Sequence, residues 1–249
     1  MGQQDNEIVL LAGLPRTGST LLQNLLAQNP DVYSEGNSGL CTVMWDAKIS
    51  CEHNAAQQLI GVGKDVTFKN ALLKSMPSIY YPDIKGKIIL DKTRTWVNEA
   101  NICMARSYIS EDVKTIVMVR PLEEIVASLV KVSAQNSFDF PYEGLLSEGG
   151  DFLREVHATY FAAKSQDPSF LFVSYDDVVS RTDETLARIY NHIGKEPFAH
   201  NVHQVTQTVF EDDERNNMVG MHDIRPEIAK QANEVVLPDW VKAACENMT

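Results

Sequence analysis

Short apolar runs recur along the chain and are separated by longer segments in which apolar and polar residues mix. The four runs are Ile8–Ala12, Lys87–Leu90, Thr115–Val119 and Phe170–Val173. A strand buried on both faces of a parallel sheet has a nearly continuous apolar sequence, whereas a half-buried strand alternates. We therefore predict four buried strands at these positions.

The segments between and after these strands are predicted to be helical. They are Thr20–Gln28, Trp96–Tyr108, Leu122–Val132, Phe152–Lys164 and Asp183–His192. Strands that alternate with helices form βαβ units, which give a parallel sheet with helices on both faces. The prediction is an α/β three-layer sandwich in a single domain, residues 1–249. Residues 36–84 and 134–150 are less regular, and we expect them to form walls of a substrate site.

Composition and charge narrow the choice of partners. The chain has 249 residues, of which 44% are hydrophobic and 22% charged, which is ordinary for one globular α/β domain. Its net charge is −12, and a field of this sign repels polyanions. We therefore expect neither a nucleic-acid partner nor a membrane partner. If such a chain binds a charged small molecule, it must gather its few cations locally.

The cysteines and the N-terminus bear on location. The four cysteines form no CxxC pair, which indicates reduced thiols in the cytoplasm. The first residues, MGQQDNE, are polar and lead directly into the first predicted strand, so no signal peptide is predicted. No apolar run approaches the roughly 18 residues that span a bilayer. The predicted location is the cytoplasm.

The segment Gly13–Thr20, with the sequence GLPRTGST, connects the first predicted strand to the first predicted helix. A glycine-rich turn at this place directs backbone N–H groups and the positive end of the helix dipole at a phosphate. Gly13 and Gly18 have the spacing of the GxxxxGK[ST] loop of nucleoside triphosphatases. Ser19 stands where that loop has its lysine, and the basic residue, Arg16, comes earlier. The missing lysine argues against ordinary ATP or GTP hydrolysis. The alternative to a phosphate-binding loop is a turn that only caps the helix.

A second candidate phosphate-binding pair follows the third predicted strand. Arg120 ends that strand, Pro121 suits a first helical turn, and Ser128 follows in the predicted helix. Arginine offers a planar fork for phosphate, and Ser128 lies about 10 Å along the helix from Pro121. The pair can therefore contact one ligand that lies across the helix. The alternative is an ion pair from Arg120 to Glu123 or Glu124, with Ser128 on the surface.

The segment PRTGSTLLQNLL, residues 15–26, resembles the 5′-phosphosulfate-binding loop of the sulfotransferase family, whose members carry PRSGTTLL or PKSGTTW there. The resemblance implies an α/β fold related to P-loop nucleotide kinases. It also implies transfer of a sulfuryl group from 3′-phosphoadenosine 5′-phosphosulfate (PAPS) to a hydroxyl or amine acceptor, which leaves adenosine 3′,5′-bisphosphate (PAP). The residues that would hold the 5′-phosphate and the sulfuryl group are Arg16, Thr17, Gly18, Ser19 and Thr20.

Three further segments resemble parts of the same family. Arg120 and Ser128 resemble its 3′-phosphate-binding element, an arginine at a strand end and a serine in the next helix. The segment FLFVSYDDVV has Tyr175 where members place an aromatic ring near the adenine, and a buried structural tyrosine is the alternative. The segment GMHDIRPEI, with His222 and Arg225, resembles a C-terminal stretch of bacterial members that would close over the nucleotide.

The resemblance also implies which residues act on the reacting group. Sulfuryl transfer resembles phosphoryl transfer, in which catalysis is mostly alignment and charge stabilisation. A sulfuryl group carries less negative charge than a phosphoryl dianion, so Arg16 and Lys92 are expected to neutralise the leaving phosphate without a metal. Lys92, in ILDKTRTW, resembles a lysine that members carry after the corresponding strand, and a solvent-exposed lysine is the alternative. The acidic run EDDE at 211–214 is predicted to be a solvated loop, because no His or Cys stands beside it at metal-ligand spacing.

The predicted general base is Glu35. Members of the family use either a histidine two residues after the lysine, where this chain has Arg94, or a glutamate shortly after the first helix. Arg94 cannot accept a proton at neutral pH. Glu35 lies slightly before the position that tyrosine-sulfating members use, which is Asn37 here. His53 and His157 are reserve candidates.

Two other function classes stay open from the sequence. A P-loop kinase or NTPase would use Asp91, which follows the second apolar run, as a magnesium-organising carboxylate. A non-catalytic nucleotide-binding module would keep the loop but need neither Lys92 nor Glu35. The acceptor is open among small molecules, carbohydrates and peptides, and the sequence predicts no oligomeric state.

Overall fold

A computed structural model describes residues 6–215, 217–230 and 234–248 of the chain. Its centre is one sheet of five parallel strands in the order β2-β3-β1-β4-β5. The strands are β1 (Glu7–Gly13), β2 (Val32–Asn37), β3 (Ile88–Lys92), β4 (Lys114–Val119) and β5 (Phe170–Ser174). Four of them coincide with the predicted strands within a residue or two. The edge strand β2 has no counterpart among the predictions, because its sequence VYSEGN lacks an apolar run.

Five of the helices correspond to predicted ones. These are α1 (Ser19–Leu26), α5 (Glu99–Tyr108), α6 (Leu122–Gln135), α8 (Asp151–Ser165) and α10 (Thr182–His192). The remaining helical segments are α2 (Leu40–Ile49), η1 (Ser50–Asn54), α3 (Ala56–Gly61), α4 (Asp65–Tyr80), η2 (Arg94–Val97), α7 (Tyr142–Leu145), α9 (Tyr175–Ser180) and α11 (Asp239–Asn247).

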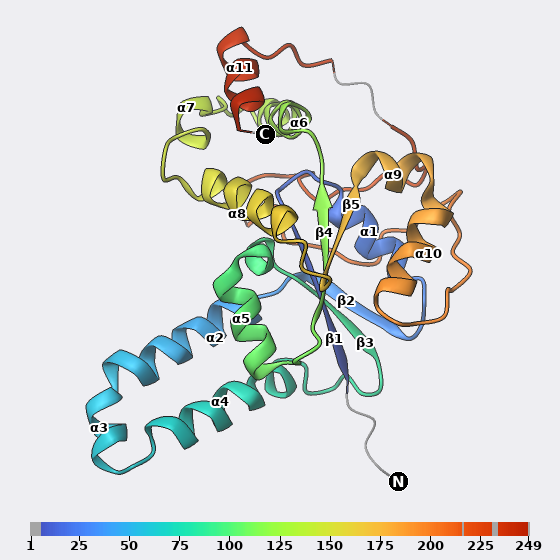
Figure 1. Cartoon of the computed structure of the whole chain (residues 1–249). Coiled ribbons are helices and arrows are strands. Elements are labelled where there is room, and N and C mark those ends of the chain that lie inside the picture. Colours follow the sequence, from blue (N-terminus) through green and yellow to red (C-terminus); the bar gives the residue numbers. More distant parts are fainter. Residues whose placement is uncertain (1–5, 216, 231–233, 249) are drawn as a thin grey trace.

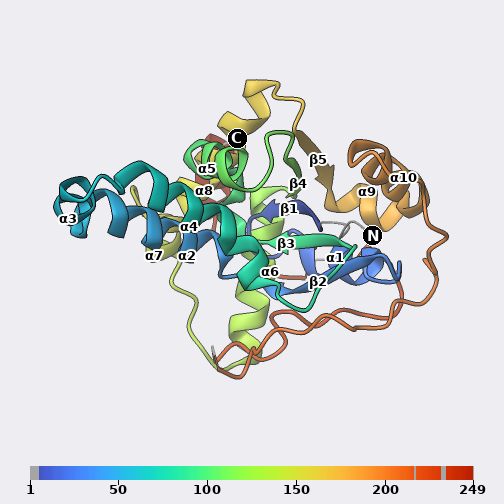
Figure 2. The ribbon, with the colours of Figure 1, turned by 90° about the horizontal axis from the view of Figure 1, so that it is seen from below.

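The helices α2, α3 and α4 occupy most of the region predicted to be less regular. They form an arm that extends from the body of the molecule (Figures 1 and 2). The sequence pattern does not predict the helices of this arm, because α2 begins with the almost uniformly apolar LCTVMW and α4 contains Pro77. Neither feature gives the regular spacing of apolar residues that predicts a helix with one buried face.

The two faces of the sheet are covered by different helices. Val9 and Leu11 of β1 belong to the core cluster with α1 and α10, whereas Leu10 and Ala12 belong to the cluster with α2, α4 and α5. All four side chains are at most 1% exposed. The continuous apolar run therefore reflects burial on both faces, as predicted. The predicted α/β three-layer fold is confirmed.

The segment 201–230, called the strap below, contains no helix or strand in its described part and runs alongside α1 (Figure 1). Asn24 of α1, whose side chain is fully buried, holds it. The Asn24 side-chain oxygen accepts hydrogen bonds from the backbone N–H groups of Thr208 at 2.6 Å and Val209 at 2.9 Å. Glu211 of the strap contacts Asn37 at the end of β2 and Lys92 at the end of β3. The strap therefore lies at the carboxyl ends of the strands, where ligand sites of open α/β sheets form. Within the described residues, no helix is both long and apolar enough to cross a membrane.

Candidate active site

The loop between β1 and α1 has a backbone that depends on its glycines. A Cβ atom on Gly13 would lie 2.7 Å from the Met118 carbonyl oxygen, and one on Gly18 would lie 2.6 Å from Cδ2 of Tyr175. Both glycines also have positive φ angles, 146° and 89°. Arg16 has a φ of 66°, a left-handed conformation that costs free energy in a residue with a side chain. The chain therefore maintains strain at the residue predicted to contact phosphate.

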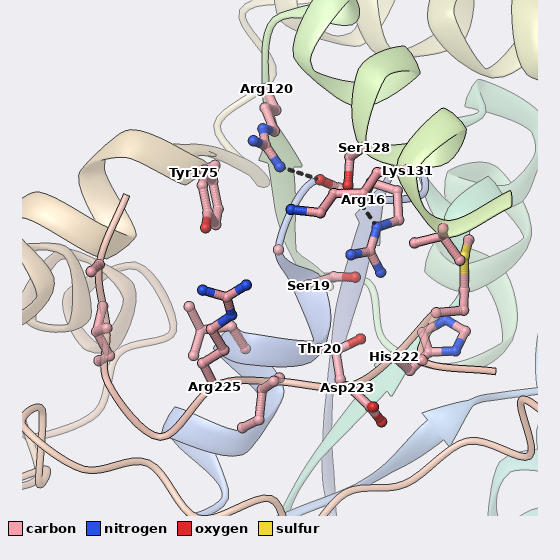
Figure 3. Close-up of a pocket in the computed structure, with 18 of the residues that line it drawn as sticks. Arg16, Ser19, Thr20, Arg120, Ser128, Lys131, Tyr175, His222, Asp223 and Arg225 are labelled. Atoms are coloured by element: carbon pink, nitrogen blue, oxygen red, sulfur yellow. Dashed lines mark hydrogen bonds between the residues drawn. The ribbon is translucent and has the colours of Figure 1, made fainter. Parts of the chain in front are cut away.

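A cavity of about 470 Å³ opens above this loop (Figure 3). Its wall includes all the predicted nucleotide-binding residues except Thr17, namely Arg16, Gly18, Ser19, Thr20, Arg120, Ser128, Tyr175 and Arg225. It also includes Lys131, so four basic side chains face one cavity in a chain of net charge −12. This concentration of cations suits a multiply charged anion.

The Thr17 side chain stabilises the loop and does not line the cavity. Its side chain is fully buried, and its hydroxyl donates a hydrogen bond to the Leu14 carbonyl oxygen at 2.8 Å. The structure therefore does not bring the Thr17 hydroxyl to the other predicted phosphate-binding groups.

The two predicted phosphate-binding elements are joined by hydrogen bonds. Arg16 Nε donates to Ser128 Oγ at 3.0 Å, and Arg120 Nη1 donates to the Arg16 carbonyl oxygen at 3.1 Å (Figure 3). The Arg120 guanidinium also lies 4.3 Å from the Tyr175 ring centre and pairs with Glu124 at 2.9 Å. The ion pair considered as an alternative function for Arg120 thus exists together with its contacts in the cavity. These contacts fix the guanidinium plane beside the loop.

Electrostatics in this part of the cavity favour an anionic ligand. Burial, and then the positive charge of Arg120, lower the pKa of Arg16. Asp213 and Asp223 oppose that shift. An arginine stays protonated even so, and a bound phosphate would relieve the repulsion between the two guanidinium groups.

Lys92 lies at the end of β3 and is buried, in contrast to the alternative of a solvent-exposed lysine. Its Nζ lies 2.6 Å from Oε1 of Glu211 and 3.3 Å from Oγ1 of Thr20. The Lys92 and Glu211 side chains are only 6% and 10% exposed. Burial lowers the pKa of Lys92, and the Glu211 carboxylate opposes this effect. Lys92 therefore joins the glycine-rich loop to the strap.

Glu35, the predicted general base, lies on β2 and is not among the residues that line the cavity. Its Oε2 accepts a hydrogen bond from the Tyr33 hydroxyl at 2.9 Å. Arg94 is half exposed and lies 3.7 Å from the buried Glu155. The reserve candidates His53 and His157 are both exposed, on η1 and α8.

The expectation that the acidic run 211–214 is a solvated loop is wrong for Glu211 and Asp213. Their side chains are 10% and 11% exposed. Besides Lys92, Glu211 accepts a hydrogen bond from Asn37 at 2.8 Å. Asp213 Oδ1 lies 2.5 Å from Nδ1 of His222. These partners are distant in the sequence, so local composition could not reveal them.

Lys131 is a cavity residue that a local signal could have identified. It lies three residues after Ser128 on α6, and positions three apart share one face of a helix. Once Ser128 is assigned to a ligand, Lys131 becomes a candidate for the same ligand.

Asp91 is engaged in the core and does not have the free carboxylate that a magnesium site requires. The side chain is fully buried. It accepts hydrogen bonds from Ser38 at 2.7 Å, Tyr81 at 2.7 Å and Trp96 at 2.6 Å. Burial raises the pKa of Asp91, and these three donors oppose the rise. Across the described residues, no group of three or more His, Cys, Asp or Glu side chains is arranged to hold a metal ion.

Sequence comparison identifies the family to which this loop and cavity belong. A family model described as the sulfotransferase family matches residues 9–199, which is more than half of the chain. The chain belongs to the sulfotransferase family. Its members are transferases that move a sulfuryl group, which agrees with the resemblance found in residues 15–26. A comparison with curated proteins gave no match.

Solved structures with the same fold include other sulfotransferases. The sulfotransferase domain from the curacin biosynthetic pathway has 16% identity and a TM-score of 0.62, with 99% of this chain and 97% of that chain covered. The sulfotransferase domain from the Synechococcus PCC 7002 olefin synthase has 16% identity and a TM-score of 0.59, with 100% and 94% covered. At this identity the likeness establishes the fold, which is the predicted P-loop-like sulfotransferase fold.

Proposed function

We propose that this sulfotransferase moves a sulfuryl group from PAPS to a hydroxyl or amine acceptor and releases PAP. The observation that carries the proposal is the joining of two anion-binding elements in one cavity. Arg16 in the loop bonds to Ser128, and Arg120 bonds to the Arg16 backbone. A nucleotide with phosphates at both its 3′ and 5′ positions has charges that match both elements.

The residues suit the chemical groups of this donor. Ser19, Thr20 and the N–H groups at the start of α1 would hold the 5′-phosphosulfate, since a helix N-terminus favours anions. Arg120, Ser128 and Lys131 would hold the 3′-phosphate. For the adenine, Tyr175 offers an aromatic face. Arg225, on the strap, would cover the nucleotide from the opposite side (Figure 3).

The catalytic contribution of the chain is positioning and charge stabilisation. Arg16 and Lys92 would neutralise the leaving 5′-phosphate, and the contact between Lys92 and Thr20 supports this role because it lies beside the loop. No metal is needed in this scheme. Glu35, the general base that the sequence predicts, lies outside the cavity wall.

We also propose a single sulfotransferase domain that acts in the cytoplasm on a small-molecule, carbohydrate or peptide acceptor. The net charge of −12 supports the absence of nucleic-acid and membrane partners.

A thermal-shift titration with PAP, ATP–Mg²⁺ and GTP tests the proposal. We expect stabilisation by PAP without metal to exceed that by the triphosphates at equal concentration. A magnesium-dependent preference for ATP would contradict it. Turnover of ³⁵S-labelled PAPS with a panel of phenols, alcohols, sugars and amines would then separate an enzyme from a module that only binds nucleotide.

A further inference from the structure

His222 has a ring orientation fixed by one carboxylate. Asp213 Oδ1 lies 2.5 Å from the ring Nδ1, and Asp213 Oδ2 accepts a hydrogen bond from the His222 backbone N–H at 2.8 Å. A carboxylate on Nδ1 orients the ring, so Nε2 is the atom through which the imidazole can exchange a proton with another group. This is the arrangement in which a base is oriented by a third group.

The other ring nitrogen faces the carboxylate that pairs with Lys92. His222 Nε2 lies 3.3 Å from Oε2 of Glu211, whose Oε1 lies 2.6 Å from Lys92 Nζ. Lys92 Nζ in turn lies 3.3 Å from Thr20 Oγ1. A single carboxylate therefore separates Nε2 from Lys92, and Figure 3 shows the imidazole beside Thr20 on the cavity wall.

We propose that His222 is the general base of the sulfuryl transfer and that Asp213 is its positioning residue; the inference rests on the proposed function. Nε2 takes the proton of the acceptor hydroxyl while the acceptor oxygen forms a bond to sulfur. The bond between sulfur and the 5′-phosphate oxygen breaks, and its electron pair stays on that oxygen, beside Arg16 and Lys92. In this scheme the acceptor hydroxyl replaces the Glu211 carboxylate at Nε2, so that this nitrogen can accept the proton.

The other candidates are less suited to accept this proton. Glu211 is held as the counter-ion of buried Lys92 and also accepts from Asn37. Glu35 accepts from Tyr33 and is not part of the cavity wall. Arg94 remains protonated at neutral pH.

The test compares His222→Gln and Glu35→Gln, with His203→Gln as the matched control because His203 is exposed on the same strap. The acceptor is the one that gives wild-type enzyme its fastest PAPS turnover in the panel above. We expect His222→Gln to lower kcat by about 10²–10⁴-fold, the usual contribution of a general base. Calorimetric affinity for PAP should stay within about twofold, since Arg16, Arg120 and Ser128 are intact. Glu35→Gln and His203→Gln should keep wild-type kcat.

Two further variants separate base catalysis from a structural role. Free imidazole should restore turnover to His222→Ala, whose shortened side chain leaves space for it. Asp213→Asn should lower kcat and leave the KM for PAPS unchanged. Wild-type kcat in His222→Gln, or loss of kcat in Glu35→Gln alone, would overturn the inference. Absence of turnover by the wild-type enzyme despite PAP binding would instead overturn the proposed function, and the inference with it.

Discussion

The two walls of the cavity differ in both construction and charge. One wall consists of the loop after β1, the residues that follow β4 and the helix α6, and it presents Arg16, Arg120 and Lys131. The other wall is the strap, which has no regular elements in its described part and carries Glu211 and Asp213 as the partners of Lys92 and His222. The difference suggests that the two walls have different roles in the reaction. The cationic wall suits the anionic donor, and the acidic wall balances charge and orients the group that receives a proton.

The walls meet through the ion pair between Lys92 and Glu211. A cation as buried as Lys92 requires a nearby anion, because an unpaired buried charge costs several kcal/mol. Glu211 meets this requirement in the absence of donor. An anionic sulfuryl group that binds next to Thr20 would take over the same role. Binding of the donor at the opposite wall is therefore expected to weaken the ion pair that holds Glu211 of the strap to Lys92.

Among changes to the two walls and their contact, the largest effect is expected from replacing Lys92, the cation that joins them. Lys92→Met should lower kcat by about 10²–10³-fold, the usual cost of losing one donor that stabilises developing charge. Affinity for PAP should fall by less than kcat does, because Lys92 contacts the 5′-phosphate of PAP but stabilises the charge that develops on this group only in the transition state. Kinetics with labelled PAPS and calorimetry with PAP check both values. An equal loss in kcat and PAP affinity would mean that Lys92 belongs to nucleotide binding rather than to the reacting group.

A smaller effect is expected on the cationic wall. Arg120→Ala should weaken PAP binding by about 10–100-fold, since a hydrogen bond to a charged group contributes about 1.5–3 kcal/mol. Lys164→Ala is the control, because Lys164 is an exposed lysine on α8 outside the cavity wall. Calorimetric titration gives both affinities, and an unchanged Kd in Arg120→Ala would remove the predicted 3′-phosphate contact.

A substitution in α1 should destabilise the strap without changing the cationic wall. Asn24→Ala leaves the backbone N–H groups of Thr208 and Val209 without their acceptor, which should lower the free energy of unfolding by about 1–3 kcal/mol. Hydrogen exchange should accelerate at these two amides and stay slow in β1. If exchange in both regions accelerates equally, the strap is not a separate unit and the comparison of two walls fails.

The smallest effect is expected from the competition between Glu211 and the sulfuryl group of the donor for Lys92. Glu211→Gln removes the anion that opposes the sulfuryl group at Lys92, so affinity for PAPS should rise by about two- to fivefold, or about 0.5–1 kcal/mol. Affinity for PAP, whose 5′-phosphate also lies near Lys92 in the proposed complex, should rise in the same direction. Equilibrium binding of both nucleotides, without acceptor, makes the comparison, and a decrease in PAPS affinity would contradict competition.

The cationic wall could be predicted from the sequence because its signals are local. The run Ile8–Ala12 predicts a strand buried on both faces, and the next residues contain both glycines and Arg16. Arg120 and Ser128 lie at the end of one strand and in the helix after it, so their spacing brings them together. Thr17 is the exception, because which hydroxyl serves the loop itself depends on its tertiary turn.

The acidic wall could not be predicted, because its contacts join distant parts of the chain. Lys92 and Glu211 are 119 residues apart, and an acidic run alone looks like a solvated loop. His222 and Asp213 lie in a segment without periodicity, so no pattern orients one toward the other. The polar edge strand β2 and the helices α2 and α4 were missed for a related reason, since packing rather than local pattern determines them.

Calorimetric titration of the wild-type protein with PAP and with adenosine 5′-monophosphate, both in EDTA, tests the central claim most directly. The claim is that one cavity binds the 5′-phosphate at the loop and the 3′-phosphate at Arg120 and Ser128. It predicts that PAP binds at least about tenfold more tightly, because the second phosphate adds charged hydrogen bonds of about 1.5–3 kcal/mol each. Equal affinities for the two nucleotides, or binding of PAP only when a divalent metal is added, would contradict it.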